Sequence, residues 1–317
     1  MRICSLLPGA TEVVAALGLA DDLVGISHEC DYPPEVRHKP VLVHAAIDPE
    51  HTSGFDIDRQ VRATLEAAQP LYTLDIVRFA QAQPDLVITQ DLCHVCAVTP
   101  DQLQHAIGAL PTPPRVLSLN PGNLDETVMD VERIGEATGR AALARALAAQ
   151  LRARLQSIRA RVASVRQCPR VVCLEWLAPL YVAGHWVPEM VACAGGDDVL
   201  GVAGAASAPV TWEQVLAAAP EVLLLMPCGF TVSRTLRELD RLSCDSIWPG
   251  WQNLPAVQDG HVFAVDASAY FSRPGPRLVD GVELLAALLH PSLFGGVTPS
   301  EACRVNLNEH NPTVRTR

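Results

Sequence analysis

A short segment of the chain combines two thiols with an imidazole. Cys93 and Cys96 are two residues apart, and His94 lies between them. Two thiolates at this spacing can share a zinc ion or form a redox pair, although they supply only half of a tetrahedral zinc site. His28 and Cys30 would complete a metal site if their loop faced the same crevice. The other interpretation is that these thiols pack in the wall of a pocket.

A neutral histidine can also bind cobalt or iron at the open axial position of a macrocycle. His28, His94 and His185 are the candidates for such a ligand. For each of them, the competing interpretation is a loop histidine that only makes hydrogen bonds.

Aromatic side chains gather in the segments that follow predicted strands. The chain has 5 Trp, 4 Tyr and 6 Phe. These segments hold Tyr32, Trp176, Tyr181, Trp186, Phe230, Tyr270 and Phe271. Rings on the wall of a cleft suit a broad, flat ligand, whereas some of these rings could instead seal the surface of the fold. Trp176 and Tyr270 are the strongest candidates for ligand contact.

No catalytic motif accompanies these residues. The chain contains no Gly-x-Ser-x-Gly elbow, no phosphate-binding glycine-rich loop and no dinucleotide fingerprint. Glu29 and Asp31 could do acid–base work, but no nucleophile is paired with a base. We therefore predict a binding protein and not an enzyme.

The loops are placed by a plan that occurs twice. Each copy has a strand that begins near an arginine, a helix that ends in glycine, and Ala-x-Pro-acid before an apolar run. The copies begin at Arg2 and Arg170, and their apolar runs are residues 86–88 and 222–225. Alternating strands and helices are typical of parallel sheets, which bind ligands at the carboxyl ends of their strands. The predicted fold class is α/β: two Rossmann-like lobes with mainly parallel sheets, joined by a single long backbone helix, with a ligand cleft between the lobes.

The predicted segments are an N-terminal α/β lobe over 1–122, linker helices over 123–168, a C-terminal α/β lobe over 169–292 and a polar tail over 293–317. Leucines at steps of three and four residues predict one long helix over about 141–166. The polar segment 44–60 is predicted as a surface loop. Residues 299–317 have no apolar period and are predicted to be a loosely attached extension.

Charge and hydropathy restrict the partners. The net charge of −11 argues against a nucleic-acid partner, since binding to phosphates needs clustered Lys and Arg. No apolar run is long enough to predict a transmembrane segment. No signal peptide is visible, and ten cysteines fit a reducing compartment, so we expect a cytoplasmic monomer. A misassigned start site would instead allow a periplasmic or cell-surface location.

Several segments match a known family pattern. They are residues 5–12, 24–27, 31–34 and 84–88 in the first lobe, and 195–196, 211–216 and 271–277 in the second. Over about 2–289 the chain resembles the substrate-binding proteins of ABC importers for cobalamin and iron chelates, with two lobes joined by a helix, and is most similar to the cobalamin binders.

The resemblance implies reversible binding of cobalamin or a related corrinoid in the cleft, either for an ABC permease or as a cytosolic carrier. Trp176, Tyr181 and Tyr270 fall where that family places ring contacts, and Tyr32 lies in the equivalent loop of lobe one. The full set of predicted ligand-binding residues adds residues from the other loops, namely Gln90, Trp186, Phe230, Phe271 and Arg273. Glu213 matches the acidic position that docks on a permease. The pattern departs from the family at Gln90, near which an aromatic residue is expected.

Two other functions compete with corrinoid binding. An iron-siderophore or haem binder would need cations in the cleft, for which Arg273 and Arg234 are candidates. A metal-dependent or thiol-redox protein would use the cluster of Cys93, His94 and Cys96.

Overall fold

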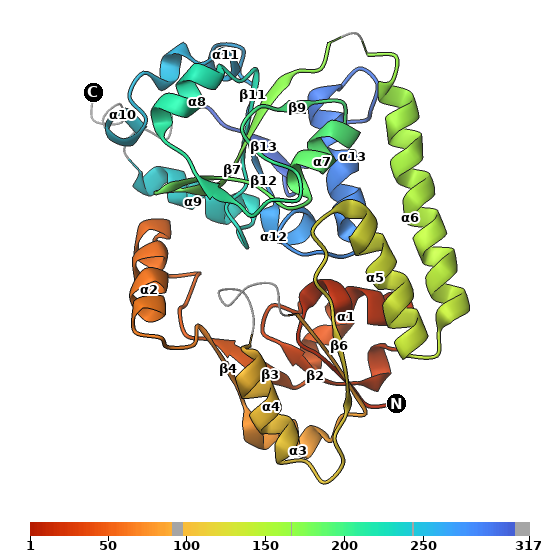
Figure 1. Ribbon diagram of the computed structural model, residues 1–317. Coiled ribbons are helices and arrows are strands. Elements are labelled where there is room, and N and C mark those ends of the chain that lie inside the picture. The colour runs from red at the N-terminus through yellow and green to blue at the C-terminus, as the bar shows by residue number, and fades with distance from the viewer. Residues whose placement is uncertain (91–97, 166, 243, 308–317) are drawn as a thin grey trace.

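The computed structural model describes residues 1–90, 98–165, 167–242 and 244–307. Two α/β lobes face each other and are connected along one side by a pair of helices (Figure 1). The connecting helices are α5 (Leu124–Ala137) and α6 (Ala141–Val162). The predicted class of two mainly parallel α/β lobes is thus confirmed, and the predicted long helix α6 is accompanied by a second helix, α5.

Lobe one is built on a six-stranded sheet with the order β4-β3-β2-β1-β5-β6. Its strands are β1 (Ile3–Ser5), β2 (Leu23–Ser27), β3 (Val41–Ala45), β4 (Tyr72–Leu74), β5 (Leu86–Thr89) and β6 (Arg115–Ser118). Its helices are α1 (Pro8–Ala16), η1 (Ala20–Asp22), η2 (Pro34–His38), α2 (Gly54–Glu66), α3 (Ile76–Ala82) and α4 (Pro100–Gly108). All neighbouring strands are parallel except β3 and β4. Central β1 and β5 are buried throughout, as their continuous apolar runs indicate.

Lobe two has the strand order β10-β8-β7-β11-β12-β13, with β9 paired to β7. Its strands are β7 (Arg170–Leu177), β8 (Leu180–Val182), β9 (Asp197–Asp198), β10 (Ala208–Pro209), β11 (Val222–Leu225), β12 (Val262–Val265) and β13 (Ala302–Arg304). Its helices are α7 (Val187–Cys193), α8 (Trp212–Ala218), α9 (Val232–Arg241), α10 (Cys244–Ile247), η3 (Trp251–Asn253), α11 (Pro255–Gln258), α12 (Ala267–Tyr270) and α13 (Arg277–Leu289). The central strands β7, β11 and β12 are parallel, whereas the pairs β7–β8, β8–β10 and β12–β13 are antiparallel.

The sequence repeat has a structural cause. The main-chain N–H of Arg2 donates to the Asp85 carboxylate, and its guanidinium donates to the carbonyl of Ala82. Arg170 makes the equivalent bonds to Glu221 and Ala218 in lobe two. In both lobes the residue before the proline, Gln83 or Ala219, has a φ of 42° that ends the preceding helix. The repeat therefore locks a helix end to the start of a central strand.

The long helix α6 packs one face against its neighbours and ends at Val162, four residues before the predicted end. Its buried stripe consists of Ala144, Ala148, Leu151, Leu155 and Ile158. Arg154 binds the carboxylates of Asp280 and Glu283 on α13 at 2.5 and 2.7 Å. No helix among the described residues has the length and apolar character needed to cross a bilayer.

Two polar segments are more ordered than their sequences predict. Part of segment 44–60, predicted as a loop, forms helix α2, whose N-cap Ser53 accepts a hydrogen bond from the N–H of Asp56. Part of the predicted loose extension forms β13, which pairs with β12. Val305 and Leu307, just after β13, are buried at 4% and 1% exposure in the core of lobe two. The prediction failed because short edge strands that pair through main-chain bonds need no apolar period.

Candidate functional site

The lobes contact each other along two seams. The first joins residues 49–54, which we name the strap, and helix α2 of lobe one to β7, β8 and α9 of lobe two. Arg234 of α9 donates to the carbonyls of Thr52 and Pro49 at 2.6 and 3.3 Å. Glu238 accepts the N–H of Gly54 at 2.7 Å. Segments more than 180 residues apart in the chain thus meet at this seam (Figure 1).

The second seam lies between α1 and the loop after β2 in lobe one and residues 273–277 in lobe two. Arg277 donates two hydrogen bonds to one carboxylate oxygen of Glu12, at 3.0 and 2.6 Å. Gly9 approaches the other lobe so closely that an added Cβ would lie 1.9 Å from the carbonyl oxygen of Pro274. Only glycine fits this contact.

Arg273 is the most enclosed cation of the second seam, with 8% of its surface exposed. It binds the Asp31 carboxylate, and it also contacts Glu29 at 3.2 Å and the hydroxyl of Ser268 at 2.9 Å. Burial by itself would lower the pKa of this guanidinium, but its interactions with Asp31 and Glu29 raise the pKa by more than burial lowers it. The side chain therefore stays charged. Two carboxylates of lobe one therefore neutralise this cation.

Between the two seams, solvent reaches the carboxyl ends of central strands. Gln90 after β5 and Trp176 in β7 are partly exposed, and Cys228 after β11 is exposed. Trp176 lies opposite Tyr181 in the β7–β8 pair, and both rings are partly exposed. The structure thus brings together two of the aromatic residues that the sequence predicts as ligand contacts.

Protein groups already contact both of these rings. The indole N–H of Trp176 donates to the carbonyl of Gly54 at 3.2 Å, and the Tyr181 hydroxyl accepts from Arg62 at 3.4 Å. Both partners belong to α2 of lobe one. The rings are therefore positioned by the opposite lobe.

Three other predicted ligand contacts are buried. Trp186, Phe230 and Phe271 are 9%, 3% and 3% exposed. Trp186 donates its indole N–H to the carbonyl of Phe271 at 2.7 Å. Phe230 is covered by Trp176, with ring centroids 5.4 Å apart, and by the guanidinium of Arg234 at 4.2 Å. These rings support the loops from behind in this structure.

The remaining predicted aromatics diverge in position. Tyr32 is 43% exposed, with its ring 4.1 Å from the guanidinium carbon of Arg277 at the second seam. Tyr270 packs against the core, and burial together with the nearby Glu301 carboxylate raises the pKa of its hydroxyl. Contact of Tyr32, Gln90 or Tyr270 with a ligand remains a prediction.

The proposed metal ligands do not converge in the part that is described. Cys93, His94 and Cys96 lie outside the described residues. Cys30 is buried, its sulfur accepts a hydrogen bond from Thr11 at 3.0 Å, and burial raises the pKa of its thiol to about 12. Nδ1 of His28 is within 3.1 Å of the carbonyl of Val43. Among the described residues, no three His, Cys, Asp or Glu side chains could hold a metal ion together.

His185 lies beside Trp186, with ring centroids 5.6 Å apart. The nearby carboxyl of Glu175 has a pKa raised by burial, partly offset by its bond from Ser207 and by His185. Ser207 donates to Glu175 at 2.7 Å. An axial role for His185 is untested.

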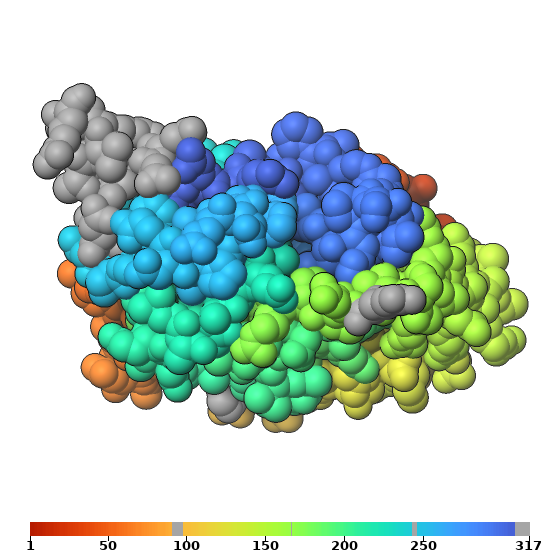
Figure 2. Space-filling view, turned by 90° about the horizontal axis from the view of Figure 1, so that it is seen from above, coloured from red at the N-terminus to blue at the C-terminus, as the bar shows by residue number. Residues whose placement is uncertain are grey.

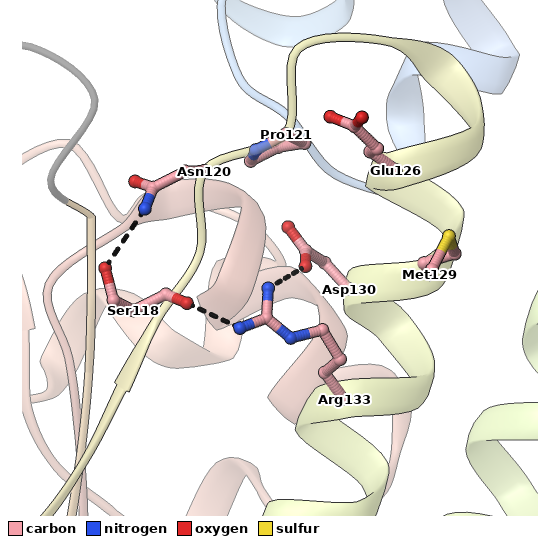
Figure 3. A pocket seen from close by; sticks show the side chains of 7 residues that line it. All are labelled: Ser118, Asn120, Pro121, Glu126, Met129, Asp130 and Arg133. Carbon is pink, nitrogen blue, oxygen red and sulfur yellow. Dashed lines mark hydrogen bonds and ion pairs between the residues drawn. The ribbon is translucent and has the colours of Figure 1, made fainter.

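Two hollows lie outside the inter-lobe region. One, of about 170 Å³, lies at the end of β6 (Figure 3). There Arg133 donates one hydrogen bond to the Asp130 carboxylate and another to the carbonyl of Ser118, each 2.8 Å long. This volume is below that of ordinary ligand sites, about 300 Å³ or more. The other, of about 650 Å³, is lined by residues 257–260 and 303–307 at the amino end of β12. That end belongs to the face of lobe two turned away from lobe one, which Figure 2 views.

Glu213 is exposed in the first turn of α8. Main-chain and Thr211 hydrogen bonds lower the pKa of its carboxyl, so it is charged at neutral pH. Docking of Glu213 on a permease stays a prediction.

Sequence reasoning missed the strap, Glu238 and helix α2. One available signal was Ser53 three residues before Asp56, a helix-start pattern. A second was the i,i+4 spacing of Arg234 and Glu238. Neither signal reveals that the two elements meet.

Comparisons with known proteins agree on one class. The chain is 27% identical over 290 residues to a vitamin B12-binding protein of Vibrio cholerae, covering 91% of this chain and 88% of the relative. It is 24% identical to an uncharacterised ABC transporter substrate-binding lipoprotein of Bacillus subtilis, and the match covers 92% of this chain and 81% of that relative.

Solved structures share the fold. A periplasmic haem-binding protein of Pseudomonas aeruginosa has a TM-score of 0.72 at 21% identity, covering 96% of this chain and 99% of that one. The periplasmic vitamin B12-binding protein of Vibrio cholerae has a TM-score of 0.64 at 24% identity, covering 92% and 97%.

The location predicted from the sequence is wrong. Residues 3–269 match the family described as periplasmic binding protein, and the Bacillus subtilis relative is a lipoprotein, so these findings point to a location outside the cytoplasm. The cysteine argument failed because Cys4, Cys30, Cys173 and Cys193 are buried, and a buried thiol does not report on its compartment. The chain belongs to the periplasmic binding protein family.

Proposed function

We propose that the chain binds a corrinoid between its lobes, as the substrate-binding protein of an ABC importer. The coarser assignment, a substrate-binding protein of the cobalamin, haem and siderophore type, follows from the family match and the relatives. The finer choice of ligand is supported by the charges at the two seams and by the exposed parts of Trp176 and Tyr181.

Charge pairing at the seams carries this proposal. Each of the arginines that reach across the lobes in the described structure has a carboxylate partner: Arg62 with Asp58, Arg234 with Glu238, Arg237 with Glu50, Arg273 with Glu29 and Asp31, and Arg277 with Glu12. None of these guanidinium groups is a free cation. The carboxylates Glu29 and Asp31 outnumber Arg273 at their end of the region.

This charge pattern discriminates between the candidate ligands. Haem and anionic siderophores present carboxylates or other anionic oxygens, which proteins recognise with Arg or Lys. A corrin ring is bordered by primary amides, whose N–H groups donate to carboxylates and whose apolar faces pack on aromatic rings. The pairing of these arginines with carboxylates therefore favours a corrinoid over an anionic chelate. The relatives named vitamin B12-binding proteins agree with this choice.

Calorimetric titration of the purified chain tests the proposal. We expect saturable binding of cyanocobalamin and cobinamide and weaker binding of haemin. Trp176→Ala should weaken corrinoid binding at least tenfold, since burying about half of an aromatic side chain is worth about 2 kcal/mol. Phe294→Ala is the control, because this ring packs on Arg161 beside the linker helix. Tight binding of haemin with no binding of either corrinoid would overturn the proposal.

A permease partner follows from the same class. We propose that Glu213 contributes to its docking surface, since it is exposed and charged at the start of α8.

A further inference from the structure

The ion pair of Arg234 and Glu238 is unusually enclosed. Its atoms Nη1 and Oε2 are 2.8 Å apart, and the two side chains are 2% and 3% exposed. Removing both charges from water is costly, so such a pair persists only when further hydrogen bonds satisfy its remaining atoms. In this structure those bonds come from the opposite lobe.

Glu238 caps a helix that belongs to the other lobe. Its Oε1 accepts the N–H of Gly54, the first residue of α2, at 2.7 Å. The first N–H groups of a helix have no partner within the helix, and a carboxylate there is also favoured by the helix dipole. Gly54 permits this approach, because an added Cβ would lie 3.0 Å from Oε1.

Arg234 holds the strap that leads into this helix. Its Nη2 donates to the carbonyl of Thr52 at 2.6 Å, and its Nε donates to that of Pro49 at 3.3 Å. The guanidinium also lies 4.2 Å from the centre of the Phe230 ring. One side chain therefore joins the strap to the aromatic residues of lobe two.

The strap lies against the aromatic residues proposed to contact the ligand. The carbonyl of Gly54 accepts the indole N–H of Trp176, and Cζ2 of the indole is 3.7 Å from the position of a Cβ on Gly54. The strap and α2 thus cover this side of the inter-lobe region.

We propose that Arg234 and Glu238 are positioning residues that form an inter-lobe clasp, which holds the strap against Trp176 and limits the rate at which ligand enters and leaves. The role in ligand exchange rests on the proposed corrinoid function, whereas the existence of the clasp does not depend on it. Because the two residues act on the strap and not on the ligand, loosening the clasp accelerates entry and exit together and changes the equilibrium affinity little.

Hydrogen exchange of the ligand-free protein tests the clasp without any ligand. In Glu238→Ala the peptides that contain the strap and the first turn of α2 should exchange at least tenfold faster, because a hydrogen bond to a charged group is worth about 1.5–3 kcal/mol. Arg237→Ala is the matched control. It removes an ion pair with Glu50 across the same seam, at 3.1 Å, but with side chains 53% and 65% exposed. We expect this control to exchange as the wild type does.

Gly54→Ala provides a second variant that leaves α9 unchanged. Its methyl group would press on Oε1 of Glu238, while alanine at the start of a helix is otherwise well tolerated. This variant should also exchange faster in the strap, and it stays informative if Glu238→Ala does not fold. Unchanged exchange in the folded variants would overturn the clasp.

Stopped-flow mixing with cyanocobalamin tests the kinetic role. We expect Glu238→Ala and Gly54→Ala to raise the association and dissociation rates by roughly tenfold each, with less than a threefold change in Kd. A rise in the dissociation rate alone, with a matching loss of affinity, would show a direct ligand contact and overturn the gating role. If the wild type binds no corrinoid, the proposed function fails, and the exchange experiment alone decides whether the clasp exists.

Discussion

The ion pair between Glu12 and Arg277 offers a sharp test of how the lobes are held at the second seam. Glu12 on α1 is 4% exposed and Arg277 on α13 is 14% exposed, counting side chains. One carboxylate oxygen accepts both hydrogen bonds from Arg277, and the other is buried without a partner. We predict that Arg277→Ala strongly destabilises the fold, because it leaves a buried carboxylate with no bonded cation.

The magnitude follows from the burial of the pair. Removing one partner of a buried ion pair costs about 3–5 kcal/mol of unfolding free energy. Arg273 also lowers the pKa of Glu12 and remains in the variant, so a loss of about 3 kcal/mol is expected. Arg152→Ala is the control, since its pair with Glu132 has side chains 46% and 33% exposed and is worth about 1 kcal/mol or less.

The pH dependence gives an independent signature. Burial raises the pKa of Glu12 above its ordinary value of 4.5, and Arg277 opposes this rise. A carboxyl whose pKa is raised by folding stabilises the fold at low pH, and this contribution is lost as the pH rises from about 4.5 through the pKa in the folded state. Arg277→Ala removes the opposing cation and raises the pKa of Glu12 further. The variant should therefore recover part of its loss between pH 7 and pH 5.

Urea unfolding followed by tryptophan fluorescence at pH 7 and pH 5 measures both effects. Glu12→Gln combined with Arg277→Met serves as a rescue, because it removes both charges together. The reasoning is refuted if Arg277→Ala matches the Arg152→Ala control at pH 7. It is also refuted if the difference between Arg277→Ala and the wild type grows on acidification from pH 7 to pH 5.

Three further predictions concern other parts of the molecule. Cys30 should resist thiol reagents at pH 8 in the folded protein, because it is buried and the pKa of its thiol is about 12, whereas exposed Cys168 should react. Mass spectrometry after labelling measures this, and equal labelling of the two cysteines would contradict it. Leu307→Ala should lower the unfolding free energy, measured by urea unfolding, by about 2–5 kcal/mol, because Leu307 is buried like a core leucine. A loss near zero would show that the segment after β13 is not part of the core. Glu213→Arg should leave the Kd for cyanocobalamin unchanged and abolish uptake by vesicles that contain the permease, whereas normal uptake would exclude Glu213 from docking.

Much of the architecture could be predicted from local patterns. The apolar runs at residues 86–88 and 222–225 form the buried strands β5 and β11, because each is a short continuous apolar segment limited by turn residues. The repeat that begins at Arg2 and Arg170 also predicted two similar lobes correctly, since each copy builds the same junction of helix end and strand.

The candidate site was predicted less completely. Aromatic residues after predicted strands were the sequence signal for Trp176 and Tyr181, which lie opposite each other in β7 and β8. Their contact with a ligand stays a prediction. The same signal failed to separate them from Phe230, which is 3% exposed, since burial depends on what packs over a ring. The contribution of α2 was missed because its partners Arg234 and Glu238 lie about 180 residues away in the chain.

The sequence by itself determined the α/β class, the two lobes and the connecting helix, because these follow from hydrophobic period and turn chemistry within short windows. The tertiary structure alone decided which charges are neutralised and which rings stay accessible. The sequence offers Arg273 and Arg234 as cations for a ligand. In the folded chain Arg273 is paired with Asp31 of the other lobe, and Arg234 is paired with Glu238 of its own helix. Electrostatic pairing depends on distances between atoms in different lobes, and such distances exist only once the chain has folded.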